Sequence, residues 1–325
     1  MTTQNGKHEV PLMVTINCLV FNHEPYLRKC LDGFVMQKTN FRFEAIVHDD
    51  ASTDGSVAII CEYARKYPDI IKPIIETENQ YSKRDGSLAR IMDKNTYGKY
   101  IALCEGDDYW TDPNKLQMQV EFLETHLDYS MCCAGAEVQS EGRITEILQP
   151  KEDCDLTPED TITRGGAFIP TLSILFRKEL LEGWREFRGN SLVGDYPLQI
   201  YCSIRGKVRF FKKIVGCYRF LSIGSWSYNH YENIENRVRY YKLENDWLKY
   251  ANEYTQREYH DSFSFVIGKN LYLIAVMTNN YTSLRFNRDV HHYITKSLSF
   301  KTKISFYMKT YYLKWLYNCW FRAVK

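Results

Sequence analysis

Short apolar runs alternate with amphipathic stretches over the first 125 residues of the chain. Each run has strand length, and a stretch with apolar residues at helical spacing follows most of them. Strands that alternate with helices predict a parallel sheet with right-handed crossovers. The four predicted strands are Leu12 to Leu19, Phe43 to Val47, Ile70 to Ile75 and Tyr100 to Cys104.

Three helices are predicted between and after these strands. The first begins near Pro25, the second is capped by Ser52 or Asp54, and the third has Asp112 as N-cap with Pro113 in its first turn. Their inward faces are expected to hold Leu27, Cys30, Leu31 and Phe34 in the first, Val57, Ile60, Cys61 and Ala64 in the second, and Leu116, Val120 and Leu123 in the third.

The pattern changes twice further along the chain. Strand-like runs continue at Met131 to Val138, Ser173 to Phe176, Val208 to Phe211 and Val215 to Tyr218, and from Asn229 onward the pattern is helical. We therefore expect one large α/β domain over 1–228, divided near residue 125 into two halves, followed by a helical region over 229–325.

Charge is distributed unevenly along the 325 residues. The formal net charge is +2, but 9 basic residues and 1 acidic residue lie between Arg285 and Lys325, so the tail carries +8 and the remainder −6. The tail is also rich in Tyr, Trp and Phe. This combination favours an anionic membrane surface over nucleic acid as the partner of the tail, and no nucleic-acid binding is expected.

Ten cysteines are scattered without C-x-x-C pairs, which argues against a zinc site. Several, such as Cys18, Cys61 and Cys104, lie in apolar runs and are expected to be buried reduced thiols. No signal peptide is recognised before Val10, and no apolar run approaches the roughly 18 residues of a spanning helix. We expect a cytoplasmic protein that is at most peripheral on the inner face of the cell membrane.

Two acidic clusters follow predicted strands, and the carboxyl ends of parallel strands are where such sheets bind ligands. In Glu105-Gly106-Asp107-Asp108, three carboxylates repel one another unless a cation lies among them, and Mg²⁺ or Mn²⁺ bridging a diphosphate needs one or two protein carboxylates. The alternative is a solvated acidic turn before the helix at Asp112.

The other cluster is His48-Asp49-Asp50-Ala51-Ser52-Thr53-Asp54-Gly55. For Ser52 and Asp54 we favour a turn that feeds a helix. Asp50 lies at the strand tip, where its carboxylate can accept hydrogen bonds from a uracil ring or a ribose.

Together these segments resemble the inverting family 2 glycosyltransferases of the GT-A fold, particularly bacterial members that build surface polysaccharides. The resemblance covers about residues 11–220. It is carried by Phe21-Asn22-His23-Glu24, Asp49-Asp50-Ala51-Ser52-Thr53-Asp54-Gly55-Ser56, Ala89-Arg90, Gly98-Lys99-Tyr100, Glu105-Gly106-Asp107-Asp108 and Pro113-Asn114-Lys115-Leu116.

The resemblance implies a Rossmann-like, mostly parallel α/β sheet flanked by helices, with a nucleotide-sugar-binding half over 11–125, an acceptor-binding half over 126–228 and a helical C-terminal extension. Asp50 would contact the base with support from Asp49, and Arg90 would lie near the diphosphate. Asp107 and Asp108 would share the ribose and the metal, Mn²⁺ or Mg²⁺. Glu105 replaces the Asp usual at its position, so its ribose contact departs from the family pattern.

An inverting transfer also needs a base that removes the proton of the acceptor hydroxyl. The family places this Asp at the start of a short helix, and Asp195 in Val193-Gly194-Asp195-Tyr196-Pro197-Leu198 fits. The alternative is that Asp195 only caps that helix. Arg219 and Gly224-Ser225-Trp226-Ser227 would close over the donor phosphates or form a plain connection. The Q-x-x-R-W signature of processive synthases does not occur, which favours transfer of a single sugar.

The tail from Lys301 to Lys325 is predicted to form an amphipathic helix with Ile304, Met308, Tyr311, Trp315 and Cys319 on one stripe. We expect it to lie at a membrane surface, which would suit a lipid-linked acceptor. The alternative is a helix packed on the protein itself or on a second subunit, as in a homodimer.

Other functions remain as alternatives. A hydride-transfer enzyme is disfavoured because no G-x-G-x-x-G follows the first strand. A sugar-phosphate nucleotidyltransferase should carry a Gly-rich basic loop where Phe21-Asn22-His23-Glu24 stands, and a non-catalytic sugar-binding module need not keep Asp107, Asp108 and Asp195. Transfer of a sugar from a nucleotide donor, with UDP favoured, to a glycan or lipid-linked acceptor is the preferred hypothesis.

Overall fold

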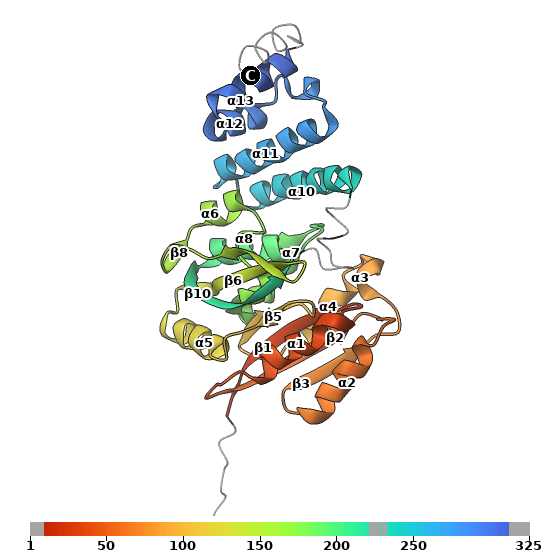
Figure 1. Cartoon of the computed structure of the whole chain (residues 1–325). Helices are drawn as coiled ribbons and strands as arrows, with labels where there is room; N and C mark the ends of the chain where they lie inside the picture. Colours follow the sequence, from red (N-terminus) through yellow and green to blue (C-terminus); the bar gives the residue numbers. More distant parts are fainter. Residues whose placement is uncertain (1–9, 221–227, 229–232, 312–325) are drawn as a thin grey trace, which may run out of the picture. The chain divides into compact units, whose positions relative to one another are not determined.

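The computed structural model describes residues 10–220, 228 and 233–311 (Figure 1). These residues fall into two compact units. The first contains the described parts of 1–157, 167–184 and 201–227, and the second contains 158–166, 185–200 and the described residues from 228 onward. The boundary predicted near residue 228 stays a prediction.

The first unit is built on one mixed sheet. In the described chain its order is β3-β2-β1-β4-β9-β6-β10-β5, with β7 added at β6 and β8 at β10. The strands are β1 (Leu12–Val20), β2 (Arg42–Asp49), β3 (Ile71–Ile75), β4 (Tyr100–Leu103), β5 (Tyr109–Trp110), β6 (Tyr129–Ser140), β7 (Arg143–Leu148), β8 (Cys154–Leu156), β9 (Leu175–Arg177) and β10 (Lys207–Arg219).

The half of the sheet formed by β3, β2, β1 and β4 is entirely parallel, as predicted. All four strands therefore end at the same edge, and the two acidic clusters follow two of them. Antiparallel pairing begins where β9 joins β4 and β6. The predicted α/β class with a mostly parallel, helix-flanked sheet is confirmed.

Helices α1 (Glu24–Val35) and α5 (Lys115–Thr125) bury the faces predicted for them. Leu27 and Leu31 of α1 share one core with Leu116 and Val120 of α5 and with strand β1. The N-cap of α5 is Asn114 rather than Asp112. The reason is that the Asp112 carboxylate lies 2.7 Å from the Lys213 ammonium, while the Gln37 side chain accepts the Leu116 N–H at 3.1 Å.

Helix α2 (Ser56–Lys66) differs from its prediction by a rotation of its inward face. Ile59, Ile60 and Tyr63 are buried, whereas Cys61 is exposed. Tyr63 decides the orientation because its hydroxyl donates to the Asp32 carboxylate of α1 at 2.6 Å. The expectation that Cys61 is buried was therefore wrong, while Cys18 and Cys104 are buried free thiols as expected.

Two predicted strands near residues 208 and 215 are one continuous strand, β10. Its register against β6 shifts between Phe211 and Ile214 and again before Gly216. These irregularities carry the exposed Lys212 and Lys213 that interrupt the apolar pattern, which explains why the sequence predicts two strands.

The second unit is helical, as predicted from Asn229 onward. Figure 1 shows α10 (Ile234–Tyr254), α11 (His260–Thr278), α12 (Arg288–Ser297) and α13 (Phe300–Thr310) following one another. Ala275, Val290, Ile294 and Phe306 share a core there. The other α-helices of the described residues are α3 (Gln80–Lys83) and α4 (Ser87–Asn95) in the first unit, and α6 (Pro158–Arg164), α7 (Leu181–Arg188) and α8 (Asp195–Arg205) further along the chain. None of the described helices combines the length and the apolar content that crossing a bilayer requires.

Candidate donor site and candidate base

The acidic turn Glu105-Gly106-Asp107-Asp108 connects β4 to β5 at the carboxyl edge of the parallel strands. Its backbone is fixed to β1, because the N–H of Gly106 donates to the Leu19 carbonyl at 2.9 Å. A Cβ on Gly106 would lie 2.8 Å from both His23 Nδ1 and a methyl of Val20, so only glycine fits. The turn therefore holds its carboxylates in a defined place.

Arg219 lies beside Asp107 and Asp108 in this unit, although more than 100 residues separate it from them in the sequence. The Arg219 N–H donates to Asp108 Oδ1 at 2.8 Å, and its guanidinium donates to the Asp107 carbonyl oxygen. The guanidinium also lies over the rings of Tyr26, at 5.0 Å, and Tyr109, at 4.5 Å. The end of β10 thus delivers a cation to the acidic turn.

The two aspartates are almost completely buried. Burial, followed by the charge of Asp107, raises the pKa of Asp108 well above its usual value. A negative charge at this place is therefore costly unless a cation compensates for it.

This donor set fits the expected metal. Mg²⁺ or Mn²⁺ bound to a diphosphate takes one or two protein carboxylates, and Asp107 and Asp108 provide two. Within residues 10–220, 228 and 233–311 there is no group of three or more His, Cys, Asp or Glu side chains arranged around a common point.

His23 is a member of this region to which the sequence assigned no role. Its Nδ1 is buried and has no hydrogen-bond partner among the described residues. Burial lowers the pKa of His23, while the charges of Asp107, Asp54 and Asp49 act in the opposite direction. The segment Phe21-Asn22-His23-Glu24 contributes to the family resemblance, and it is the sequence feature that could have placed His23 near the acidic turn.

The segments after β1 and β2 bind each other through reciprocal hydrogen bonds. The N–H of Asn22 donates to Ser52 Oγ at 2.8 Å, and Asn22 Oδ1 accepts the Thr53 N–H at 2.8 Å. Asp54 accepts from the backbone N–H of Glu24 at 2.9 Å and from that of Ser56 at 3.0 Å. Ser52 and Asp54 are thus engaged in the turn, and Gly55 rather than either of them is the N-cap residue of α2.

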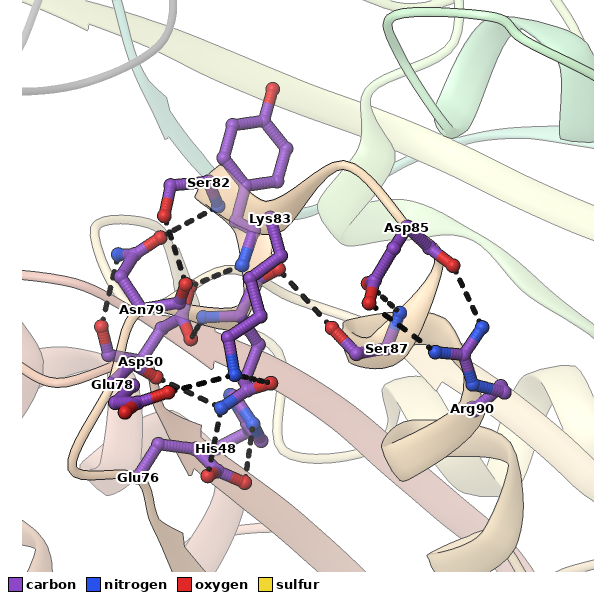
Figure 2. A network of polar contacts seen from close by, with 12 residues as sticks. His48, Asp50, Glu76, Glu78, Asn79, Ser82, Lys83, Asp85, Ser87 and Arg90 are labelled. Atoms are coloured by element: carbon purple, nitrogen blue, oxygen red, sulfur yellow. Dashed lines mark hydrogen bonds and ion pairs between the residues drawn. The ribbon is translucent and has the colours of Figure 1, made fainter.

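Asp49 and Asp50 differ in how their carboxylates are engaged. Asp49 Oδ1 accepts the Ser52 N–H at 2.9 Å, whereas its buried Oδ2 has no hydrogen-bond partner in the described structure. Both oxygens of Asp50 accept backbone N–H groups, from Gln80 at 2.6 Å and from Tyr81 at 3.0 Å. Figure 2 shows Asp50 beneath the short helix α3, which it holds in place.

The same polar network extends to β3 and α4. The buried His48 ring lies 3.6 Å from Glu76, and Lys83 pairs with Glu78 at 3.0 Å (Figure 2). Arg90 contacts Asp85 rather than the acidic turn: its guanidinium donates to the Asp85 carbonyl at 2.7 Å and lies 3.7 Å from the Asp85 carboxylate. The Arg90 side chain is 54% exposed, so it is free to change partners.

Glu105 differs from its neighbours because its side chain is exposed. Its backbone carbonyl accepts the Asp108 N–H at 3.0 Å and so closes the turn. The segment Gly224-Ser225-Trp226-Ser227 lies outside the described residues.

Asp195 belongs to the second unit, where it is the first residue of α8. Its Oδ1 accepts the N–H of Tyr196 at 2.8 Å. Tyr196 is buried, and its hydroxyl donates to the Ile162 carbonyl at 2.6 Å, which anchors the start of the helix. The Asp195 carboxylate therefore lies in the first turn of α8 and accepts a backbone N–H there.

Comparison with known proteins places the chain in a family. The model of "Glycosyl transferase family 2" matches residues 15–184. The protein Rv1520 of Mycobacterium tuberculosis, described as uncharacterized, is 34% identical over 217 residues, which cover 66% of this chain and 60% of that protein. The chain thus spans less than two thirds of the length of such relatives.

Two further proteins carry informative names. WfaP of Escherichia coli, a "UDP-Glc:alpha-D-GlcNAc-diphosphoundecaprenol beta-1,3-glucosyltransferase", is 34% identical over 113 residues, or 35% of this chain and 42% of that protein. The structure of Staphylococcus aureus TarS 1–349 with UDP-GlcNAc superposes with a TM-score of 0.61 at 16% identity, covering 92% of this chain and 81% of that one. The similarity to TarS concerns the fold.

Proposed function

The chain belongs to glycosyl transferase family 2, and we propose that it moves one sugar from a nucleotide-sugar donor to a glycan or lipid-linked acceptor in surface-polysaccharide synthesis. The observation that carries the proposal is the meeting of Asp107, Asp108 and Arg219 at the carboxyl edge of the parallel strands. Two acidic groups and one guanidinium suit a diphosphate and its cation.

The donor is proposed to be a UDP-sugar. This choice is supported by the names of the similar proteins, UDP-Glc for WfaP and UDP-GlcNAc for the TarS complex. In this chain Asp49 and Asp50 would contact the base, Asp107 and Asp108 would share the ribose and the metal, and Glu105 could also reach the ribose.

The donor diphosphate would lie at the acidic turn. Mn²⁺ or Mg²⁺, held by Asp107 and Asp108, would stabilise the negative charge that builds on the leaving diphosphate. Arg219, held between Tyr26 and Tyr109, adds a fixed positive charge beside these carboxylates. Arg90 would exchange Asp85 for a phosphate oxygen, which its exposure permits.

Asp195 is proposed as the base of an inverting transfer. Its carboxylate would take the proton of the acceptor hydroxyl while that oxygen bonds to the anomeric carbon, and the bond to the diphosphate breaks with its electron pair on the leaving group. The anchored start of α8 supports this role because a base must be held in one orientation.

A lipid-linked acceptor is proposed for two reasons. The name of WfaP specifies a diphosphoundecaprenol-linked sugar, and the basic aromatic tail of this chain suits an anionic bilayer. The protein would then work at the inner face of the cell membrane. Packing of the tail in a homodimer is the alternative.

Release of UDP from a panel of UDP-sugars, with water as acceptor, tests the proposal. UDP release is expected with Mn²⁺, to vanish with EDTA, and to vanish in Asp107→Ala. Asp195→Ala should still bind the donor but lose turnover. Pyrophosphate in place of UDP would indicate a nucleotidyltransferase, and donor binding without any turnover in the native chain would indicate a sugar-binding module; either result would overturn the proposal.

A further inference from the structure

A second carboxyl group lies in the neighbourhood of Asp195. Glu244 of α10 is partly buried, and both of its oxygens are engaged. The Tyr240 hydroxyl donates to Oε1 at 2.6 Å, and the Asn270 amide of α11 donates to Oε2 at 2.7 Å. Two neutral donors hold the carboxylate in place without neutralising it.

A small hollow connects this group to the start of α8. Glu244, Tyr240 and Trp247 of α10 line it together with Val193 and Tyr196. Tyr196 directly follows Asp195, the first residue of α8, so Glu244 and the start of that helix border the same small space.

The two acids interact electrostatically. Burial raises the pKa of Glu244, and the charge of Asp195 raises it further. The other groups that face Glu244 are Tyr240 on its own helix, Lys269 and Asn270 on α11, and Tyr196 on α8. Lys269 is the cation in this set and favours the charged form of Glu244. Because the interaction between two charges is mutual, Glu244 acts on Asp195 as Asp195 acts on Glu244.

We propose that Glu244 is a positioning residue for Asp195: its negative charge, held by Tyr240 and Asn270, makes the Asp195 carboxylate a stronger proton acceptor. The inference rests on the proposed function, in which the proton of the acceptor hydroxyl passes to Asp195. An ordinary aspartate, with a pKa of about 3.9, is a weak base at neutral pH. A like charge nearby favours the protonated form of a carboxyl group and so makes the carboxylate a better proton acceptor, as general-base catalysis near neutral pH requires.

Glu244→Gln tests the inference. Glutamine keeps the size of the side chain and an acceptor oxygen for Tyr240, but it removes the charge. In UDP release with the most reactive UDP-sugar and Mn²⁺, we expect the acid limb of the kcat/KM–pH profile to move to lower pH by at least about half a unit. The plateau should fall several-fold while the melting temperature stays close to that of the native chain.

Asp246→Asn is the matched control. It makes the same change on the same helix, at a side chain that is 71% exposed and pairs only weakly with Lys249 at 3.2 Å, and it should leave the profile unchanged. Tyr240→Phe keeps the ring, removes one hydrogen bond to Glu244 and should move the acid limb in the same direction as Glu244→Gln.

The outcomes distinguish a failure of the proposed role of Glu244 from a failure of Asp195 as the base. Loss of turnover in Asp195→Asn together with an unshifted acid limb in Glu244→Gln and Tyr240→Phe overturns the role of Glu244 alone. Full turnover in Asp195→Asn removes the base itself and with it the proposed mechanism. A drop in melting temperature without a shift of the profile would show that Glu244 serves only the packing of α10 on α11.

Discussion

Arg177, at the end of β9, connects four chain segments through one buried guanidinium. It donates to the carbonyls of Tyr129 at 2.7 Å, Leu123 at 2.7 Å and His126 at 3.2 Å, and to the Tyr100 hydroxyl at 3.2 Å. Arg177→Met would leave these acceptors buried without a donor. We expect the free energy of unfolding to fall by about 3 kcal/mol in urea denaturation.

Arg28→Met provides the comparison. Arg28 is also hydrogen-bonded, to the Glu62 carboxylate at 2.7 Å, but its side chain is 54% exposed. Its loss should lower the free energy of unfolding far less than the loss of Arg177, because solvent screens an exposed ion pair. Equal losses of unfolding free energy in the two variants would contradict the view that the burial of Arg177, rather than hydrogen bonding alone, makes it important for stability.

Lys115 is fully buried in α5, with its ammonium 2.7 Å from Gln119 Oε1 and 4.2 Å from the centre of the Trp110 ring. Burial lowers the pKa of Lys115 to about 8. Between pH 8 and the unfolded pKa of about 10.4, the unfolded chain binds more protons than the folded one, so stability contributed by this group rises with pH.

Comparison with Lys115→Met isolates that contribution. The native chain should gain about 2–3 kcal/mol of unfolding free energy relative to Lys115→Met between pH 7.5 and 10.5. Other groups that titrate in this range are common to both proteins and cancel in the difference. A difference that does not change with pH would show that Lys115 keeps its ordinary pKa in the folded state.

For single residues, the sequence predicts which carboxylates lie near the donor site, but not which hydrogen bonds each of them makes. Asp107, Asp108 and Arg219 were each predicted to serve the donor, and they lie together in the structure, while their roles stay predictions. The engagement of both Asp50 oxygens by Gln80 and Tyr81 depends on a short helix whose position no local pattern reveals. Glu244 was not predicted, because its relation to Asp195 arises only when α10 packs beside α8 within the second unit.

Among the elements, α1 approaches β5 unusually closely. A Cβ on Gly33 would lie 2.9 Å from the Trp110 N atom and 3.1 Å from its carbonyl oxygen. Gly→Ala inside a helix normally stabilises by about 0.5–1 kcal/mol. Gly33→Ala should instead destabilise by more than 1 kcal/mol and weaken UDP binding, since Trp110 follows the acidic turn by two residues.

Gly194→Ala is the corresponding control for the stability measurement, because a Cβ at Gly194 meets nothing within 4 Å. Thermal melting of the two variants beside the native chain gives the comparison. A Gly33→Ala protein as stable as the native chain would mean that α1 and β5 can separate without cost.

The sequence predicted where helices and strands occur when one periodic pattern ran through the segment. It did not always predict which face of a helix is buried. α1 and α5 bury the predicted faces. In α2 two overlapping stripes fit the helical period equally well, and the bond from Tyr63 to Asp32 selects the one without Cys61. The single strand β10 was predicted as two because Lys212 and Lys213 interrupt its apolar pattern at a register shift.

For the whole molecule, the positive charge of residues 285–325 and the negative charge of the remaining residues predict that the tail binds an anionic membrane. α13 packs Phe306 into the core of the second unit, and residues 312–325 lie outside the described part. A chain ending at Tyr311 keeps that packing and removes Lys314, Arg322 and Lys325. It should no longer sediment with vesicles that contain phosphatidylglycerol, whereas the full chain should do so at low salt and less at high salt.

Sedimentation of both chains to the same extent would exclude the tail as the membrane contact. A sedimentation-equilibrium mass that falls from dimer to monomer on truncation would instead support packing of the tail on a second subunit.

The central claim is that the buried pair Asp107 and Asp108 binds the diphosphate through a divalent cation. Calorimetric titration of UDP in the presence of Mn²⁺ tests it most directly, with the native chain, Asp108→Asn and the exposed control Asp69→Asn. Asp108→Asn removes a charge that burial disfavours and should not lower the melting temperature. The account predicts that UDP affinity falls at least about tenfold in Asp108→Asn and on removal of Mn²⁺, corresponding to about 1.4 kcal/mol or more, while Asp69→Asn binds as the native chain does. Equal UDP affinity in all three proteins, with and without the metal, would contradict it.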